Sequence, residues 1–215
     1  LSAQAKMRVA TGEVRVDFTA LQGRTDKYIA ATRKAMAARL GQLGVELVAG
    51  RGRLAGADSV EVETIDGAKS LNFKSCIVAT GTRPAAFPGL TPDGARIMDS
   101  TGFLALAEMP KSLIVVGGGF IGLEMAQAAH RMGAHISIVD ALPRLAGLED
   151  PEVSKVLETV FKRQGWDIRL GVKVAGVKTE GEAAVLSLEG GEPLAAEAAL
   201  IAVGRRPNTA DLGLE

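Results

Sequence analysis

The sequence is poor in the residues that most often carry out chemistry. It contains a single cysteine, Cys76, which excludes an intramolecular disulfide and a Cys-x-x-Cys metal or redox site within this chain. Its two histidines, His130 and His135, stand in no motif with a carboxylate or a second cysteine. We therefore expect both to be structural, and we predict no catalytic residue and no metal ligand in this chain.

The sequence also lacks an excess of charge and a long hydrophobic run. Lysine and arginine total 25 and aspartate and glutamate total 25, so electrostatics give no reason to expect nucleic acid or an anionic membrane as a partner. No apolar run approaches the length of a membrane span, and the N-terminal residues lack the apolar region of a signal peptide. We expect a soluble, cytoplasmic protein. Without an initiator methionine or a clear pattern at either end, the chain also looks like part of a longer one.

The strongest pattern runs from Lys111 to Asp140. Residues 112–116 are an apolar, β-branched run that predicts a buried parallel strand. Gly117–Gly122 follow directly and fit G-x-G-x-x-G; residues 123–132 predict a helix and residues 136–139 a second strand. Asp140 ends that strand, 23 residues after Gly117 (140 − 117). A lone glycine loop can be a turn that binds nothing, but the complete pattern is the dinucleotide-binding fingerprint.

Each part of this fingerprint has a physical role. Gly117 makes the tight turn out of the strand, Gly119 lets the backbone approach a pyrophosphate, and Gly122 lets the helix pack against the sheet. The helix directs its free N–H groups and its positive end toward the phosphates. Asp140 can accept hydrogen bonds from both ribose hydroxyls and would repel the 2′-phosphate of NADP. NAD is therefore the favoured cofactor, although Arg144 nearby keeps NADP as an alternative.

The rest of the chain predicts two further long helices and several strands. One helix begins after the N-cap Asp17 and ends near Leu43, with an apolar stripe that we expect to face a core. The other begins at Asp150-Pro151 and ends near Gln164. We place Cys76 in a core strand, a turn at residues 50–52 and a hairpin turn at Asp66-Gly67. The predicted extended segments are 14–16, 45–48, 60–64, 71–73, 75–79, 168–170, 172–178, 183–188 and 198–203. Pro84, Pro88 and Pro92 predict a rigid connection between domains.

Several motifs, in this order, resemble the pyridine nucleotide-disulfide oxidoreductases of class I, and most of all their dihydrolipoamide dehydrogenase branch. Gly-Leu-Glu at 122–124 favours that branch over glutathione and mercuric reductases, which usually have alanine at the third glycine position. The matching segments are 16–18, 50–54, 77–84, 99–101, 116–124, 143–145 and 202–208.

The resemblance implies an α/β fold: a Rossmann-like NAD-binding domain, with a parallel sheet and an antiparallel meander, next to part of an FAD-binding domain. Residues 1–88 resemble the later part of the FAD domain, 89–204 the NAD domain, and 205–215 the start of the return to the FAD domain. The implied FAD-contacting residues are Gly52, Thr80, Gly81 and Thr82. The implied NAD-binding residues are Gly117, Gly118, Gly119, Phe120, Ile121, Gly122, Leu123, Glu124, Asp140, Val174 and Gly204.

The family's first FAD fingerprint, its Cys-x4-Cys pair and its C-terminal His-Glu pair have no counterpart in this sequence. The resemblance implies an enzyme that oxidises dihydrolipoamide, free or carried on a lipoyl protein, through a cysteine pair and FAD to NAD, and that forms a homodimer. We expect this chain alone to be inactive, to lose FAD, and to expose apolar surface of its partial FAD domain. The alternatives are a related FAD/NAD(P)H reductase acting on glutathione, mercuric ion, a quinone or another acceptor, and a non-catalytic nucleotide-binding module.

Overall fold

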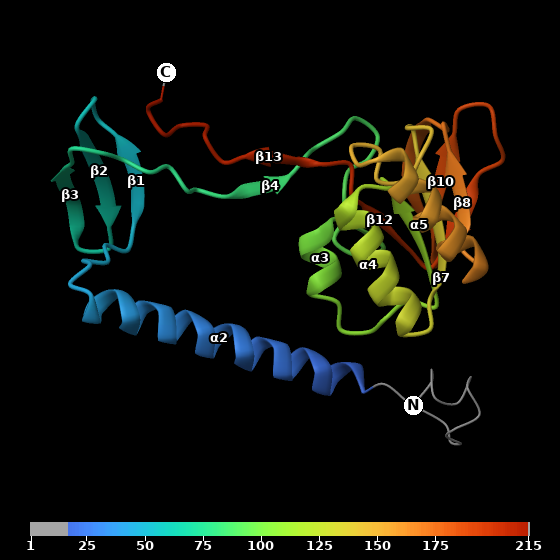
Figure 1. Cartoon of the computed structure of the whole chain (residues 1–215), viewed down its shortest axis with the longest axis horizontal. Helices are drawn as coiled ribbons and strands as arrows, with labels where there is room; N and C mark the ends of the chain where they lie inside the picture. Colours follow the sequence, from blue (N-terminus) through green and yellow to red (C-terminus); the bar gives the residue numbers. More distant parts are fainter. Residues whose placement is uncertain (1–16, 215) are drawn as a thin grey trace. The chain divides into compact units, whose positions relative to one another are not determined.

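The computed structural model of the chain describes residues 17–214 (Figure 1). Contacts divide the chain into two compact units. The first unit contains the residues up to Gly23 together with Pro84–Gly204, and the second contains Arg24–Arg83 together with the residues from Arg205 onward. The extended piece expected at residues 14–16 lies outside the described residues.

The first unit is built on a parallel sheet whose strand order is β5-β12-β6-β7-β8. Helix α4 (Phe120–Arg131) connects β6 to β7, α5 (Pro151–Arg163) connects β7 to β8, and the short α3 (Ser100–Leu104) precedes β6. The predicted parallel sheet with crossover helices is therefore confirmed. The strands are β5 (Ile97–Met98), β6 (Ser112–Val116), β7 (His135–Asp140), β8 (Asp167–Leu170) and β12 (Ala198–Ile201).

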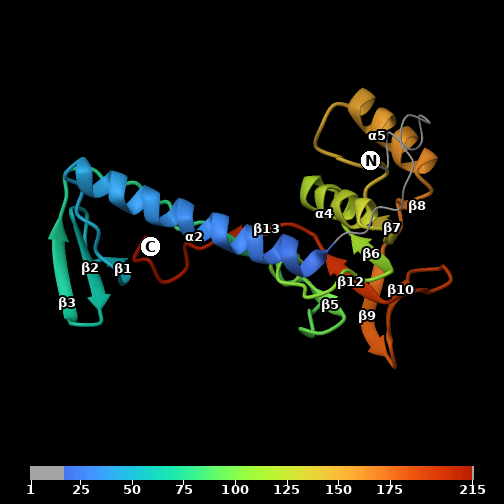
Figure 2. The same ribbon diagram turned by 90° about the horizontal axis from the view of Figure 1, so that it is seen from below.

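Alternate side chains of these strands enter two separate cores. Leu113 and Val115 of β6 pack with α4, α5 and α3, whereas Ile114 and Val116 pack against β10. The second face is covered by the antiparallel meander of β9 (Val174–Glu180), β10 (Ala183–Leu188) and β11 (Leu194–Ala196). Helices and meander lie on opposite sides of the sheet (Figure 2). A strand buried on both faces must be apolar throughout, which explains the unbroken run in β6.

The predicted helix ends are confirmed by their caps. The Asp17 carboxylate accepts a hydrogen bond from the Ala20 N–H at 2.8 Å, at the start of α2 (Phe18–Gln42). The Asp150 carboxylate accepts one from the Glu152 N–H at 2.8 Å, with Pro151 in the first turn of α5. Beyond α5, Gly165 has φ of +85°, a conformation that glycine adopts without strain.

The second unit contains most of α2 and an antiparallel sheet of β1 (Arg51–Leu54), β2 (Ser59–Thr64) and β3 (Gly67–Asn72). The predicted hairpin is confirmed, since Thr64 pairs with Gly67 across the turn. Two short strands, β4 (Thr82–Pro84) and β13 (Arg205–Pro207), pair with each other. These strands carry the two Arg-Pro sequences of the chain, which the fold brings side by side.

The apolar stripe of α2 is not a core face in this structure. None of the residues of α2 is buried, and Tyr28 and Met36 are 73% and 61% exposed. The prediction of a core-facing stripe is wrong for the described residues, while the expectation of exposed apolar surface is confirmed. Periodicity specifies that a helix has an apolar face, but burial needs a partner element, and none covers this face within residues 17–214.

Four local predictions in the second unit are also wrong. Residues 45–48 and 75–79 form no strand, and Cys76 is exposed rather than buried. Arg51 and Gly52, predicted in a turn, belong to β1, where Gly52 pairs with Val62. A β-branched run becomes a strand only when a second strand is available to pair with its backbone, and the described residues supply none for these two segments.

Asp93 fastens the loop before β5 to the meander of the first unit. Its Oδ1 accepts the N–H groups of Ala95, Arg96 and Ile97 at 2.8–2.9 Å, and its Oδ2 accepts the Thr179 hydroxyl of β9 at 2.5 Å. Burial by itself would raise the pKa of Asp93, but the hydrogen bonds from Thr179 and from the three amides outweigh it. They lower the pKa from 3.8 to about 2.

This lowered pKa predicts a stability contribution that is lost in acid. Because the folded pKa lies below the unfolded one, the contribution is complete above pH 3.8 and disappears as the pH falls through 2. We expect Asp93→Asn to lower the unfolding free energy by about 1 kcal/mol at neutral pH, as loss of a capping carboxylate does, and by less at pH 2. Urea unfolding at a series of pH values measures this, with Asp58→Asn as the control. Parallel curves for the variant and the unmutated chain would contradict it.

Candidate functional site

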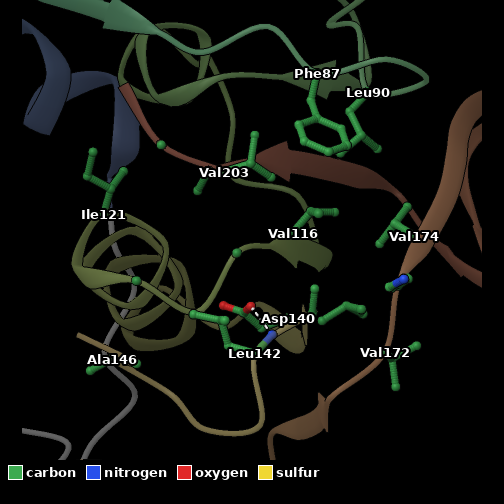
Figure 3. A pocket seen from close by; sticks show the side chains of 18 of the residues that line it. Phe87, Leu90, Val116, Ile121, Asp140, Leu142, Ala146, Val172, Val174 and Val203 are labelled. Atoms are coloured by element: carbon green, nitrogen blue, oxygen red, sulfur yellow. Dashed lines mark hydrogen bonds between the residues drawn. The ribbon is translucent and has the colours of Figure 1, made fainter. Parts of the chain in front are cut away.

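A cavity of about 710 Å³ lies at the carboxyl ends of the parallel strands (Figure 3). It opens between the ends of β6 and β12, which are neighbours in the sheet. From β6 the chain continues to β7, which lies on one side of β6, whereas β12 lies on the opposite side of β6. In open α/β sheets such a reversal of strand order creates a crevice, and ligands bind there. Residues at the ends of three strands line it, among them Val116 of β6, Asp140 of β7 and Ala202 after β12.

The glycine loop lines one side of this cavity, and its glycines differ in what they allow. Gly117 has φ of +109°, and a Cβ there would clash with the Ala202 carbonyl group. A Cβ on Gly122 would clash with the Gly117 carbonyl oxygen and lie 3.1 Å from Val115 Cγ1, so Gly122 lets α4 approach β6. A Cβ on Gly119 would meet no atom within 4 Å. Gly117 and Gly122 are therefore needed for close backbone packing within the sheet and between α4 and β6, whereas Gly119 faces open space beside the cavity.

The N-terminus of α4 is free to bind an anion. Gly119 occupies the N-cap position and supplies no side-chain hydrogen bond, unlike Asp99 and Asp150, which cap α3 and α5. The first N–H groups of a helix have no partner within it, so they are directed toward whatever lies beyond the end. Gly119, Phe120 and Ile121 line the cavity at this end, an arrangement that suits a phosphate group.

The Asp140 carboxylate is held in place at the cavity by two backbone groups. Its Oδ2 accepts the Gly118 N–H at 2.6 Å, and its Oδ1 accepts the Leu142 N–H at 2.8 Å. Each carboxylate oxygen retains a second lone pair for a ligand hydroxyl. The glycine loop and the acid, separated by 22 residues between Gly118 and Asp140, therefore form one hydrogen-bonded unit.

The remaining wall of the cavity is mostly apolar and is built from several separate segments of the chain. Figure 3 shows Val172 and Val174 on one side of the cavity, with Phe87 and Leu90 above Val203. The charged residues of the lining, besides Asp140, are Glu149, Lys173 and Glu189. Val174 was implied by the family resemblance, whereas no sequence pattern marks Phe87, Leu90 and Val172 as site residues, because they come from separate segments that only the folded sheet brings together.

The structure gathers about half of the predicted site residues at this cavity. Gly117, Gly119, Phe120, Ile121, Asp140, Val174 and Gly204 line it. Gly118, Gly122 and Leu123 lie behind this lining, and Leu123 is buried in the core. Glu124 is exposed and lines a separate groove with Gln127 and Arg131, so its role in NAD binding stays a prediction from the family resemblance.

The predicted flavin-contacting residues belong to the second unit. Gly52 lies in β1, and the turn Thr80-Gly81-Thr82 leads into β4. Asn208 binds this turn: its N–H donates to the Gly81 carbonyl at 3.0 Å and its side-chain amide to the Thr80 carbonyl at 3.1 Å. The Arg205 guanidinium donates to the Thr82 carbonyl at 2.8 Å. The carbonyl groups of the turn are thus engaged with the segment that follows Gly204.

Neither a membrane-spanning helix nor a metal site occurs in the part of the chain that the structure describes. Among residues 17–214, no helix is long and apolar enough to cross a membrane. Within the same residues, no group of three or more histidine, cysteine, aspartate or glutamate side chains is placed to hold a metal ion.

Comparison with known proteins identifies the family. The chain belongs to the pyridine nucleotide-disulphide oxidoreductase family, whose model matches residues 3–215. This confirms the resemblance seen in the sequence motifs, and it agrees with an α/β fold that combines a parallel sheet with antiparallel sheets. Members of this family use FAD and NAD(P). The cavity, with its uncapped helix end, open Gly119 and held carboxylate, fits the pyridine nucleotide of that pair.

Individual relatives indicate the range of activities in the family. A dihydrolipoamide dehydrogenase of Chaetomium thermophilum is 35% identical over 96% of this chain and 42% of its own length. The crystal structure of LpdA from Mycobacterium tuberculosis superposes with a TM-score of 0.87 at 27% identity, over 99% of this chain and 48% of that one. The HOCl-induced flavoprotein disulfide reductase RclA of Escherichia coli gives a TM-score of 0.81 at 28% identity, over 92% and 45%. The chain therefore spans less than half the length of these relatives.

Proposed function

We propose that this chain is the NAD-binding part of a flavin-dependent oxidoreductase that oxidises dihydrolipoamide. The observation that carries the proposal is the Asp140 carboxylate, held by Gly118 and Leu142 beside the glycine loop in an otherwise apolar cavity. A carboxylate at the end of the second strand of this fingerprint accepts the hydroxyl groups of the adenine ribose. The similarity to dihydrolipoamide dehydrogenases over most of the chain supports the choice of substrate.

The geometry around Asp140 favours NAD over NADP. A 2′-phosphate would place its negative charge against the carboxylate, which is repulsive at this short range. Arg144, the nearest arginine that follows in the sequence, donates to the Gly147 carbonyl at 2.6 Å and does not line the cavity. Its charge is thus engaged with the loop, which supports a structural role for Arg144 rather than a role in binding the phosphate.

The residues of this chain position the cofactor and carry out no proton transfer. NAD bound in this cavity would supply the acceptor for a hydride from a reduced flavin. The N–H groups at the start of α4 hold the pyrophosphate, Asp140 holds the ribose, and the apolar lining excludes water from the cavity. Thiol chemistry requires a cysteine pair, and Cys76 is the one cysteine in the sequence, so the dithiol step depends on cysteines that this chain does not supply.

The other parts of the proposal concern the complete enzyme. We propose that Gly52 and the turn Thr80-Gly81-Thr82 contact FAD there, that the enzyme is a cytoplasmic homodimer, and that its substrate is dihydrolipoamide, free or carried on a lipoyl protein. The runner-up is a related disulfide reductase with another acceptor, which the similarity to RclA favours. An enzyme that oxidises dihydrolipoamide and a reductase with another acceptor differ in the residues that contact the substrate. Those residues lie outside the dinucleotide-binding fingerprint.

Calorimetric titration of the 215-residue chain with NADH and with NADPH tests the proposal. We expect saturable binding of NADH and at least about tenfold weaker binding of NADPH, since one unfavourable charge contact is worth more than about 1.4 kcal/mol in a partly enclosed site. Calorimetry is preferable to intrinsic fluorescence, because the single tryptophan, Trp166, is buried against Phe161 and does not line the cavity. Failure of NADH to bind would overturn the proposal.

Replacement of Gly119 separates binding from folding. In Gly119→Ala the new methyl group meets no protein atom within 4 Å, and the backbone φ of −76° suits any residue. We therefore expect unfolding by urea to be unchanged within about 0.5 kcal/mol. The methyl group lies where the pyrophosphate must approach the backbone, so NADH should bind about tenfold or more weakly. Unchanged affinity would show that the phosphates do not approach Gly119.

A further inference from the structure

The segment between Ala85 and Leu90 contributes Phe87 and Leu90 to the cavity wall, within the stretch from Pro84 to Pro92 that the sequence predicts as a connection between domains. The Ala85 N–H donates to the Gly204 carbonyl at 3.0 Å, and the Val177 N–H of β9 donates to the Gly89 carbonyl at 2.9 Å. The segment is thus tied at one end to the loop after β12 and at the other to the meander. It is a fixed wall of the first unit.

The position of this segment depends on a close approach of two backbones. Gly89 has φ of +76°, and a Cβ there would lie 3.1 Å from the Ala175 carbonyl oxygen. Just beyond it, the Leu90 N–H donates to the Phe87 carbonyl at 3.0 Å, which closes a tight turn. Leu90 is 4% exposed and packs in the core formed with β10. Leu90 therefore anchors the turn, and the turn presents Phe87.

The Phe87 side chain, unlike that of Leu90, does not belong to either hydrophobic core cluster. Its side chain is 56% exposed, yet it lines the cavity with Val174 and Val203. Figure 3 shows the Phe87 ring beside Leu90, above Val203 and on the side of the cavity away from Asp140. An aromatic ring that a rigid turn holds at the wall of an apolar cavity is available for contact with a flat ligand ring.

We infer that Phe87 is a cofactor-binding residue, whose ring contacts a heteroaromatic ring of the dinucleotide. This inference rests on the proposed function and adds a third point of attachment to it. The glycine loop holds the phosphates, Asp140 holds a ribose, and Phe87 provides an aromatic surface for a base. Contact between a base and an aromatic side chain is tolerant of the exact base, since each base has a π-face, and it strengthens binding about tenfold.

Variants at position 87 test this contact by calorimetric titration of the 215-residue chain with NADH. We expect Phe87→Ala to bind NADH about tenfold more weakly, Phe87→Tyr to bind within about twofold of the unmutated chain, and Phe87→Leu to bind between the two. Leu104→Ala is the matched control, because Leu104 is 63% exposed in the same unit and does not line the cavity. Circular dichroism during thermal unfolding checks that each variant folds.

The outcomes separate this inference from the function on which it rests. If the unmutated chain binds NADH and Phe87→Ala binds equally well, the inference is overturned and the proposed function stands. If Phe87→Leu binds as tightly as the unmutated chain, the wall is merely apolar and the aromatic contact is overturned. If the unmutated chain binds no NADH, both fail together. A loss in Phe87→Ala that Phe87→Tyr restores supports the inference.

Discussion

Replacing Asp140 with alanine should weaken NADH binding about a hundredfold and remove the preference for NADH over NADPH. The expected loss follows from the hydrogen bonds of a charged acceptor, each of which contributes about 1.5–3 kcal/mol. Part of the loss is indirect, because the carboxylate also fixes the N–H groups of Gly118 and Leu142. The alanine variant therefore combines a lost ligand contact with a loosened loop.

Asp140→Asn distinguishes these two contributions. Asparagine has the same shape and retains one oxygen acceptor, so it can keep one of the two backbone hydrogen bonds while losing the charge. We expect Asp140→Asn to bind NADPH more tightly than the unmutated chain, since the repulsion of the 2′-phosphate is removed. Calorimetric titration with both cofactors measures this, and an unchanged ratio of the two affinities would exclude Asp140 from cofactor selection.

Arg144→Ala is the control for this experiment. Because the Arg144 guanidinium donates to the Gly147 carbonyl in the loop after β7, we expect no change in the ratio of NADH to NADPH affinity. A selective loss of NADPH binding would instead identify Arg144 as a phosphate ligand. That result would revive NADP as the cofactor, the alternative that the sequence leaves open.

Replacing Gly117 with alanine should destabilise the first unit by about 3 kcal/mol or more. Two costs add. A residue with a side chain is strained at φ of +109°, by about 1–3 kcal/mol, and the new Cβ would clash with the Ala202 carbonyl group, 2.8 Å from its carbon. Relieving that clash must separate the ends of β6 and β12, whose backbones are joined by the Ala202 N–H to Val116 carbonyl hydrogen bond.

Gly133→Ala isolates the conformational part of this cost. Gly133 has φ of +104°, close to that of Gly117, but a Cβ there meets no atom within 4 Å. We expect this control to lose about 1–2 kcal/mol, from backbone strain alone. Urea unfolding followed by circular dichroism measures both variants. Equal losses at the two positions would show that the contact with Ala202 carries no cost.

The sequence predicted best where structure is set by neighbours along the chain. The strand, glycine loop, helix, strand and acid from Ser112 to Asp140 appear as expected, because turn geometry, helix caps and strand alternation are local properties. The caps at Asp17 and Asp150 and the hairpin between β2 and β3 follow for the same reason. From this pattern alone the dinucleotide fingerprint was predictable, and the resemblance carried by the other motifs predicted the fold class.

Predictions that depended on a distant partner were less successful. The stripe of α2 and the segment around Cys76 have the composition of core elements, yet they are exposed, because composition does not specify what covers a surface. For the same reason the sequence did not predict that Phe87 and Leu90 line the cavity, since both lie in a proline-rich segment that is typical of a connection between domains. Glu124, predicted from its place in the motif, is on the exposed face of α4 and does not line the cavity, and its contact with NAD stays a prediction.

The sequence by itself therefore determined the family, the parallel strands with their glycine loop, and the acid at the end of β7. The tertiary structure alone decided which residues meet at the cavity. Asp140 binds the peptide of Gly118, and the turn of Phe87 is fastened to β9 and Gly204, through contacts between segments that are far apart in sequence. Hydrogen bonds and apolar contacts form wherever the chain brings groups together. A local pattern specifies each element, whereas a binding site is formed by contacts between elements.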